Sequence, residues 1–207
     1  MDFSDPASSV ISPNMSRVLR RLSILTEATS GRRIHSLSGA SSLSTTQRIL
    51  DQLEVVGLVS ATPIARSKLY TLNRDHLLWE PLGQLLSASI TFEQRVGQTI
   101  TELAPPDSVG VLFGSVARGT ANAESDVDVL VVVPDNTAAD ARYDLVSALS
   151  DSIELLSGNR AQAIAVTFTE LKNMVQLHDP LVDSWRREGR KVTPGPSLTQ
   201  LMGRQSA

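Results

Sequence analysis

Apolar residues recur at helical spacing in the first third of the chain. The pattern predicts a helix from Ser16, a short helix over 31–38 and a third helix that ends at Gly57. Residues 44–47, Ser-Thr-Thr-Gln, fit a capping box and are expected to start that third helix. Its apolar positions are Ile49, Leu50, Leu53 and Val56. Residues 1–14 have no such period and are expected to form a loose N-terminal arm.

Two short strands are expected after the third helix, at 58–60 and 68–72, joined by a loop that contains Pro63. Three helices followed by strand, loop and strand is the layout of a winged helix-turn-helix. In that layout the third helix enters the major groove of DNA and the loop, or wing, contacts phosphates. Candidate DNA-contacting residues are Thr45, Thr46, Gln47 and Arg48 on the helix, and Arg66 and Lys68 on the wing. The alternative is a small domain that only packs, dimerises or binds protein.

A long helix is expected after the wing, over 82–103, where apolar residues again recur at helical spacing before Ala104-Pro105-Pro106 ends the pattern. We therefore predict three parts: a winged helix at 1–78, a connecting helix at 79–103 and a second domain at 104–207.

The second domain alternates apolar runs with helical patterns. Strands are expected at 109–113, 129–133 and 161–167, with a helix over 136–157 between the last two and another from Thr169. Together with the N-terminal half, this predicts an α+β protein.

The candidate functional residues lie next to the first two of these strands. Gly114-Ser115 follows the first strand, and Asp126 and Asp128 open the second. Side chains alternate along a strand, so both carboxylates face one side and can share a divalent cation such as Mg²⁺. Glycine lets a backbone approach a phosphate, and serine can donate hydrogen bonds to it. Arg118 is a candidate for further neutralisation of phosphate charge.

The segment LFGSVARGTANAESDVDVLVVV closely resembles the signature of nucleotidyltransferases of the DNA polymerase beta superfamily, in particular its minimal members. The resemblance implies a small mixed sheet and transfer of a nucleoside monophosphate from an NTP to an acceptor hydroxyl, with Mg²⁺ or Mn²⁺ as cofactor. It implies that Gly114 and Ser115 hold the phosphates and that Asp126 and Asp128 bind the metal and serve catalysis. The sequence LEVVGLVSATPIARSKLYTLN likewise resembles the last helix and wing of MarR- and ArsR-type regulators.

One position departs from the family pattern. Active members carry a third carboxylate on a later strand, and the strand at 161–167 places Gln162 there. A neutral amide cannot accept a proton from an attacking hydroxyl at neutral pH. Asp135, Asp144 and Glu170 are other acids, but the sequence does not place them in the site. Two functions stay open: an active nucleotidyltransferase, or a DNA-binding regulator or antitoxin-like protein that binds nucleotide with little turnover.

Charge and composition indicate which partners and which cellular compartment to expect. Residues 1–78 hold 9 Lys and Arg against 6 Asp and Glu, whereas residues 79–207 hold 10 against 16. The basic front is consistent with double-stranded DNA as partner, and a homodimer is a further expected assembly. Cysteine is absent, which excludes disulfides and thiol catalysis, and the three histidines are far apart in sequence. No apolar run is long enough for a membrane span and no signal peptide is recognised, so the cytoplasm is the expected compartment.

The C-terminal tail adds no site. Arg186, Arg187, Arg190 and Lys191 form a basic cluster that is expected to be a solvated helix end. Residues beyond Thr193 are expected to be a frayed terminus.

Overall fold

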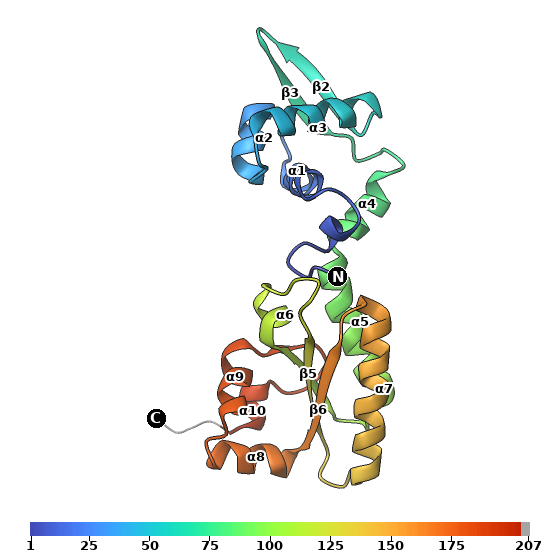
Figure 1. Ribbon diagram of the computed structural model, residues 1–207, viewed down its shortest axis with the longest axis vertical. Helices are drawn as coiled ribbons and strands as arrows, with labels where there is room; N and C mark the ends of the chain where they lie inside the picture. Colours follow the sequence, from blue (N-terminus) through green and yellow to red (C-terminus); the bar gives the residue numbers. More distant parts are fainter. Residues whose placement is uncertain (204–207) are drawn as a thin grey trace. The chain divides into compact units, whose positions relative to one another are not determined.

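The computed structural model describes residues 1–203 and divides into two compact units. One unit is Asp5–Ser89, and the other combines Met1–Ser4 with the chain from Ile90 on. The first unit has a small antiparallel sheet beside helices, and the second has a mixed sheet with helices on both faces (Figure 1). The α+β class expected from the sequence is confirmed. No helix within residues 1–203 is long and apolar enough to cross a membrane.

The unit Asp5–Ser89 consists of helices and a small antiparallel sheet. Its elements are η1 (Pro6–Ser9), α1 (Pro13–Ile24), β1 (Thr29–Ser30), α2 (Gly31–Ser38), α3 (Leu43–Val55), β2 (Val59–Ile64), β3 (Ser67–Leu72) and α4 (Trp79–Leu86). The strands pair antiparallel in the order β1-β3-β2. The helices and β3 enclose one apolar core, in which Leu19, Leu22, Ile34, Leu50 and Tyr70 are fully buried.

Two local predictions in this unit are wrong. The part of the expected loose arm that belongs to this unit is anchored, because Pro6 and Ala7 are buried and α1 already begins at Pro13. The cap of α3 is Ser42 rather than the expected Ser44. The backbone of Ser42 is extended, and its hydroxyl accepts from the Thr45 amide at 3.1 Å.

The second unit carries the mixed sheet. Its elements are α5 (Ala88–Leu103), β4 (Val109–Phe113), α6 (Gly114–Arg118), β5 (Val127–Val133), α7 (Ala139–Ser157), β6 (Ala161–Thr167), α8 (Phe168–Gln176), α9 (Pro180–Glu188), β7 (Arg190–Lys191) and α10 (Leu198–Leu201). The strand order is β6-β5-β4-β7, with β5 and β6 parallel and the other pairs antiparallel.

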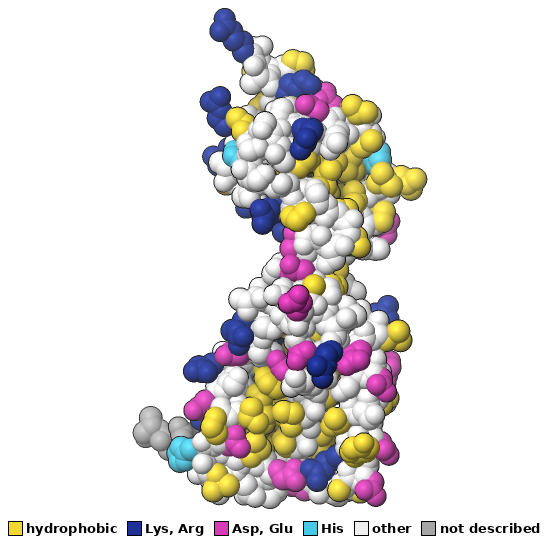
Figure 2. All heavy atoms as spheres, in the orientation of Figure 1, with side chains coloured by type: hydrophobic (Ala, Val, Ile, Leu, Met, Phe, Trp, Pro, Cys, Tyr) yellow, Lys and Arg dark blue, Asp and Glu magenta, His cyan; other side chains and the backbone are white. Residues whose placement is uncertain are grey.

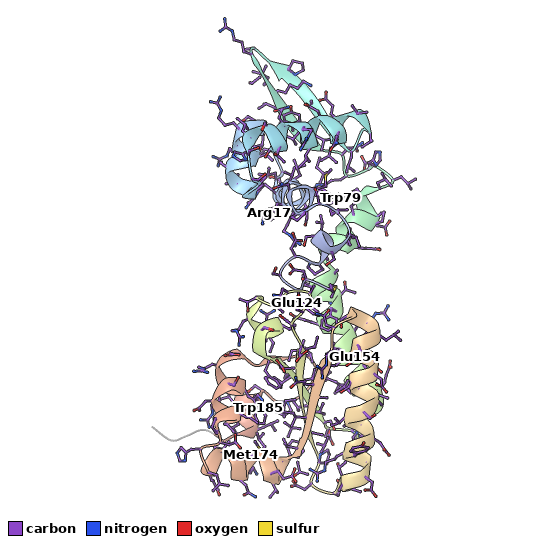
Figure 3. The ribbon with its side chains drawn as sticks, viewed as in Figure 1. Arg17, Trp79, Glu124, Glu154, Met174 and Trp185 are labelled. Atoms are coloured by element: carbon purple, nitrogen blue, oxygen red, sulfur yellow. The ribbon has the colours of Figure 1, made fainter. Side chains whose placement is uncertain are left out.

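Alternation along β5 decides which helices cover which face of this sheet. Val127, Val129, Val131 and Val133 share a core with α5 and α7. Leu130 and Val132 share a core with α8, α9 and α10. Trp185 of α9 points toward the sheet from that second face, and its ring meets Phe113 edge-on at 6.1 Å between centroids (Figure 3).

Two further sequence expectations change here. The expected connecting helix over 79–103 is two helices, α4 and α5, which are separated at Ser87. The division between the two compact units falls within α5, after Ser89. The tail beyond Thr193 is not frayed up to Gly203, because α10 packs Leu198 and Met202 into the core; the rest of that prediction, 204–207, lies outside the described residues.

Candidate functional site

The turn from β4 into α6 requires glycine. Gly114 has φ of +68°, a conformation that L side chains rarely adopt. A Cβ atom at this position would lie 2.1 Å from the Oδ2 atom of Asp128. The backbone of the Gly-Ser turn therefore lies directly against one of the two predicted metal-binding carboxylates. Ser115 follows in the half-buried first turn of α6, and its carbonyl accepts from the Thr120 amide at 3.0 Å.

Three strands bring the other predicted residues to the same end of the sheet. Asp128 lies opposite Phe113 on β4 and opposite Gln162 on β6. The Nε2 atom of Gln162 donates to Oδ2 of Asp126 at 2.7 Å. The position predicted to have lost its acid is therefore in direct contact with the aspartate pair.

Burial and charge act together on Asp128. Burial raises the pKa of its carboxyl above the ordinary value, and the negative charge of Asp126 raises it further. Arg118 opposes this shift, and Glu188 adds to it. The charged groups of α6 and of the end of α9 therefore lie close enough to Asp128 to act on it.

Arg118 is held by an acid that the sequence did not point out. Its Nη1 atom donates to Oε2 of Glu188, the last residue of α9. Glu188 lies within the run of basic residues that was expected to be a solvated helix end, so its sequence context hides its role. Only the packing of α9 against the sheet brings it to Arg118.

Asn159 is a second residue that the sequence did not point out. It follows α7 and is 4% exposed. Its Nδ2 atom donates to the carbonyls of Asn122, Ala123 and Ser125 at 3.0–3.3 Å. These carbonyls belong to the loop that leads into Asp126, so Asn159 anchors that loop.

The remaining acids considered from the sequence lie at the other end of the sheet. Asp135 follows the end of β5 and accepts from the Thr169 amide at 2.7 Å. Glu170 pairs with Arg142 at 2.6 Å, and Asp144, two residues after Arg142 on α7, is exposed. None of these carboxylates joins Asp126 and Asp128.

The carboxylates at this end of the sheet provide part of the ligand set that a magnesium ion needs. Among residues 1–203, no group of three or more His, Asp or Glu side chains could hold a metal ion. Asp126 and Asp128 alone provide two carboxylates on one face. Mg²⁺ commonly binds through one or two carboxylates, keeping waters and substrate phosphates as its other ligands. The pair therefore fits a divalent cation that arrives with a nucleotide, and no closed metal cage is present in this part of the chain.

The predicted DNA-contacting residues are only partly brought together. A hollow of about 760 Å³ lies between α3 and the hairpin of β2 and β3, and Gln47, Arg66 and Lys68 line it together with Arg32 of α2. Lys68 also pairs with Glu54 at 2.8 Å. In Figure 2, dark blue side chains of Lys and Arg project from the surface of the unit Asp5–Ser89.

The other three predicted DNA-contacting residues differ in exposure. Thr46 is fully buried, and its hydroxyl donates to the Ser42 carbonyl at 3.1 Å, so it cannot reach DNA. Thr45 is half-buried, and its hydroxyl accepts from Ser42. Arg48 is exposed but does not line the hollow.

Part of the second unit is similar to a known protein family. Residues 97–192 match the family model described as "Nucleotidyltransferase domain". The match includes the segment whose motif indicated a nucleotidyltransferase. No curated protein matches the chain.

A solved structure described as "Crystal structure of the toxin-antitoxin with AMP-PNP" is similar to part of this chain. It is 18% identical, the match covers 53% of this chain and 77% of that chain, and the TM-score is 0.38. So loose a superposition says nothing about the site.

Proposed function

We propose that the nucleotidyltransferase domain binds an NTP with Mg²⁺ and transfers its nucleoside monophosphate to an acceptor hydroxyl, with release of pyrophosphate. The observation that supports this most is the contact between the Gly114 backbone and Asp128, with Asp126 on the same face. That arrangement puts a phosphate-binding turn next to two cation-binding carboxylates. Nucleotidyl transfer needs both, because charge on the transferred phosphoryl group must be neutralised while the acceptor attacks.

Each residue has a part in this reaction. The amide and hydroxyl of Ser115 donate to phosphate oxygens, and Gly114 lets those oxygens approach the backbone. Asp126 and Asp128 would hold the divalent cation, which when bound supplies positive charge at the attacking and leaving oxygens. Arg118 donates further hydrogen bonds to the triphosphate. The acceptor hydroxyl must give up its proton, and because Gln162 cannot take it, the proton would pass to a phosphate oxygen of the substrate or to water.

Gln162 supports a second candidate function. A domain that holds a nucleotide but has no base is suited to sense nucleotide, in a DNA-binding regulator or antitoxin-like protein, with slow or absent turnover. The hydrogen bond from Gln162 to Asp126 favours this candidate, since it occupies a carboxylate oxygen that a metal would use.

One assay separates the two candidates. The full chain is incubated with labelled NTPs and Mg²⁺ or Mn²⁺ in the presence of DNA, RNA, tRNA or protein acceptors. Label transferred to an acceptor supports the enzyme, whereas nucleotide binding without transfer supports the sensor. Binding is measured by calorimetry on the wild type and on Asp128→Asn, which removes one charge at nearly constant shape. We expect Asp128→Asn to weaken Mg²⁺-dependent NTP binding strongly, and equal affinity would refute the site.

We further propose that the unit Asp5–Ser89 is a winged helix that binds double-stranded DNA through the hollow beside α3. Arg32, Arg66 and Lys68 would contact phosphates, and Gln47 would contact base edges. Arg32, Arg66 and Lys68 line this hollow, and although Lys68 is paired with Glu54, the excess of positive charge supports a polyanionic partner.

Salt dependence tests this proposal. Each phosphate contact that is lost lowers the slope of log affinity against log salt by about 1. We expect Arg66→Ala to weaken binding to all duplexes and to lower that slope, and Gln47→Ala to alter sequence preference. Arg95→Ala removes one exposed charge from the other unit and should change neither. Absence of duplex binding at low salt would refute the proposal.

A further inference from the structure

Glu188 and Arg118 form an ion pair beside Asp128, at the end of the sheet where the nucleotide is proposed to bind. The pair is formed by elements far apart in sequence, since Arg118 ends α6 and Glu188 ends α9. The nucleotidyl transfer derived above gives a part to Arg118 but none to Glu188 or to the ion pair itself. Its place in that reaction depends on which partner is fixed and which is free to move.

The Glu188 end of the pair is fixed. Val182 and Trp185 of α9 are 2% and 1% exposed and anchor the helix in the core. The Glu188 side chain itself is only 17% exposed. The chain then turns at Gly189, where a Cβ atom would lie 2.3 Å from the Trp185 carbonyl oxygen, so this turn is tightly packed.

The Arg118 end is the adaptable one. Arg118 is the last residue of the five-residue helix α6, and its side chain is 47% exposed. A guanidinium group has five N–H donors in a rigid fork, and the bond to Glu188 uses one of them. The others remain available to a ligand while Glu188 fixes the orientation of the group.

We propose that Glu188 is a positioning residue, which holds the Arg118 guanidinium ready to bind the β- and γ-phosphates of the NTP. The inference rests on the proposed nucleotide site. Its energetic basis is conformational entropy, because an arginine that is already ordered loses less freedom when the triphosphate arrives. The rival arrangement is that Glu188 competes with the phosphates for Arg118.

The sign of one substitution separates positioning from simple charge. Glu188→Gln removes a negative charge near a polyanionic ligand, so electrostatics alone predicts tighter NTP binding. Positioning predicts the opposite, a loss of about 3-fold to 10-fold in NTP affinity, the equivalent of ordering one long side chain. The nucleoside monophosphates should be unaffected, because they lack the phosphates that Arg118 would contact.

The experiment is a double-mutant cycle on the full chain, with calorimetry of ATP, GTP, CTP and UTP and their monophosphates in Mg²⁺. The variants are Glu188→Gln, Arg118→Ala and the double variant. We expect Glu188→Gln to weaken NTP binding in the wild-type background and to have no weakening effect in the Arg118→Ala background. Glu170→Gln, which alters the similar ion pair with Arg142 at the other end of the sheet, is the matched control and should leave all affinities unchanged.

Two results would overturn the inference. Tighter NTP binding by Glu188→Gln would show competition instead of positioning, and the same effect in both backgrounds would show that Glu188 does not act through Arg118. Failure of the wild type to bind any NTP would refute the nucleotide site itself, and the inference with it, whereas wild-type binding without coupling refutes the inference alone. If Glu188→Gln does not fold, Glu188→Asp keeps the charge but shortens the reach, and is expected to weaken NTP binding in the same way.

Discussion

Restoring a carboxylate at position 162 is the sharpest test of the site. Gln162 lies opposite Asp128, and its amide is 2.7 Å from Oδ2 of Asp126. Gln162→Glu keeps the side-chain length, replaces this hydrogen bond with repulsion and places a third carboxylate beside Asp126 and Asp128. If the missing acid is what limits turnover, Mg²⁺-dependent transfer should rise by about 10²–10⁴-fold, the usual contribution of a general base.

The same substitution has an effect that does not depend on knowing the acceptor. Two like charges about 4 Å apart repel by between about 1 kcal/mol in water and about 4 kcal/mol near a protein surface. The metal-free Gln162→Glu protein should therefore be less stable than the wild type by an amount in this range. A divalent cation that binds the three carboxylates in the folded state should restore the stability, because a ligand that binds only the folded state stabilises it.

Thermal unfolding with and without Mg²⁺ measures this effect, and the transfer assay runs in parallel. Gln162→Ala is the control, since it removes the amide without adding charge. If Mg²⁺ does not change the thermal stability of Gln162→Glu, position 162 is not next to the metal site. A wild type that already transfers nucleotides rapidly, together with an unchanged Gln162→Ala, would show that another group takes the proton.

Two further predictions concern the contact between Gly114 and Asp128. Because burial and then Asp126 raise the pKa of Asp128, its contribution to stability is present below the carboxyl pKa of the unfolded chain and is lost as pH rises through the raised value. We therefore expect metal-free Asp128→Asn to be more stable than the wild type at neutral pH, and the difference in free energy of unfolding should disappear in acid. A difference in denaturant unfolding that does not depend on pH would contradict this. Gly114→Ala should abolish Mg²⁺-dependent NTP binding. Gly119→Ala is the control, because Gly119 has φ of +71° and nothing lies within 4 Å of its Cβ position. This control should cost a similar strain of about 1–2 kcal/mol and leave NTP binding in calorimetry unchanged.

The sequence predicts the sheet well where residues follow a simple period. The apolar runs become β4, β5 and β6, and the period of two along β5 turns Asp126 and Asp128 to one face, away from Val127 and Val129. The same period, carried across the parallel pairing of β5 and β6, puts Gln162 beside them. This part of the site could be predicted because it depends only on strand geometry.

Thr46 was assigned to the DNA surface against a period that was already visible. It precedes Ile49 by three residues and Leu50 by four, so on a helix it shares their inward face. The structure buries all three. The polar character of Thr46 suggests the DNA surface, but its position on α3 places it on the buried face.

Glu188 and Asn159 could not be predicted in this way. The position of Glu188 depends on how α9 docks through Trp185, and that of Asn159 on how the end of α7 meets a loop more than 30 residues earlier. Such contacts arise from tertiary packing, which no local period encodes. Both residues support a neighbour of the proposed nucleotide site, and neither belongs to the recognised motif.

The contact between Gln162 and Asp126 also bears on how strongly the missing acid affects metal binding. The amide now presents its N–H group to a carboxylate oxygen. Rotation of that amide by half a turn would present its carbonyl oxygen instead, which is a ligand that Mg²⁺ accepts. The cost is one hydrogen bond, about 1 kcal/mol, which is roughly a 5-fold loss of affinity. A glutamine at this position is therefore expected to weaken metal binding only mildly while removing the proton acceptor completely, so nucleotide binding and turnover should respond very differently to it.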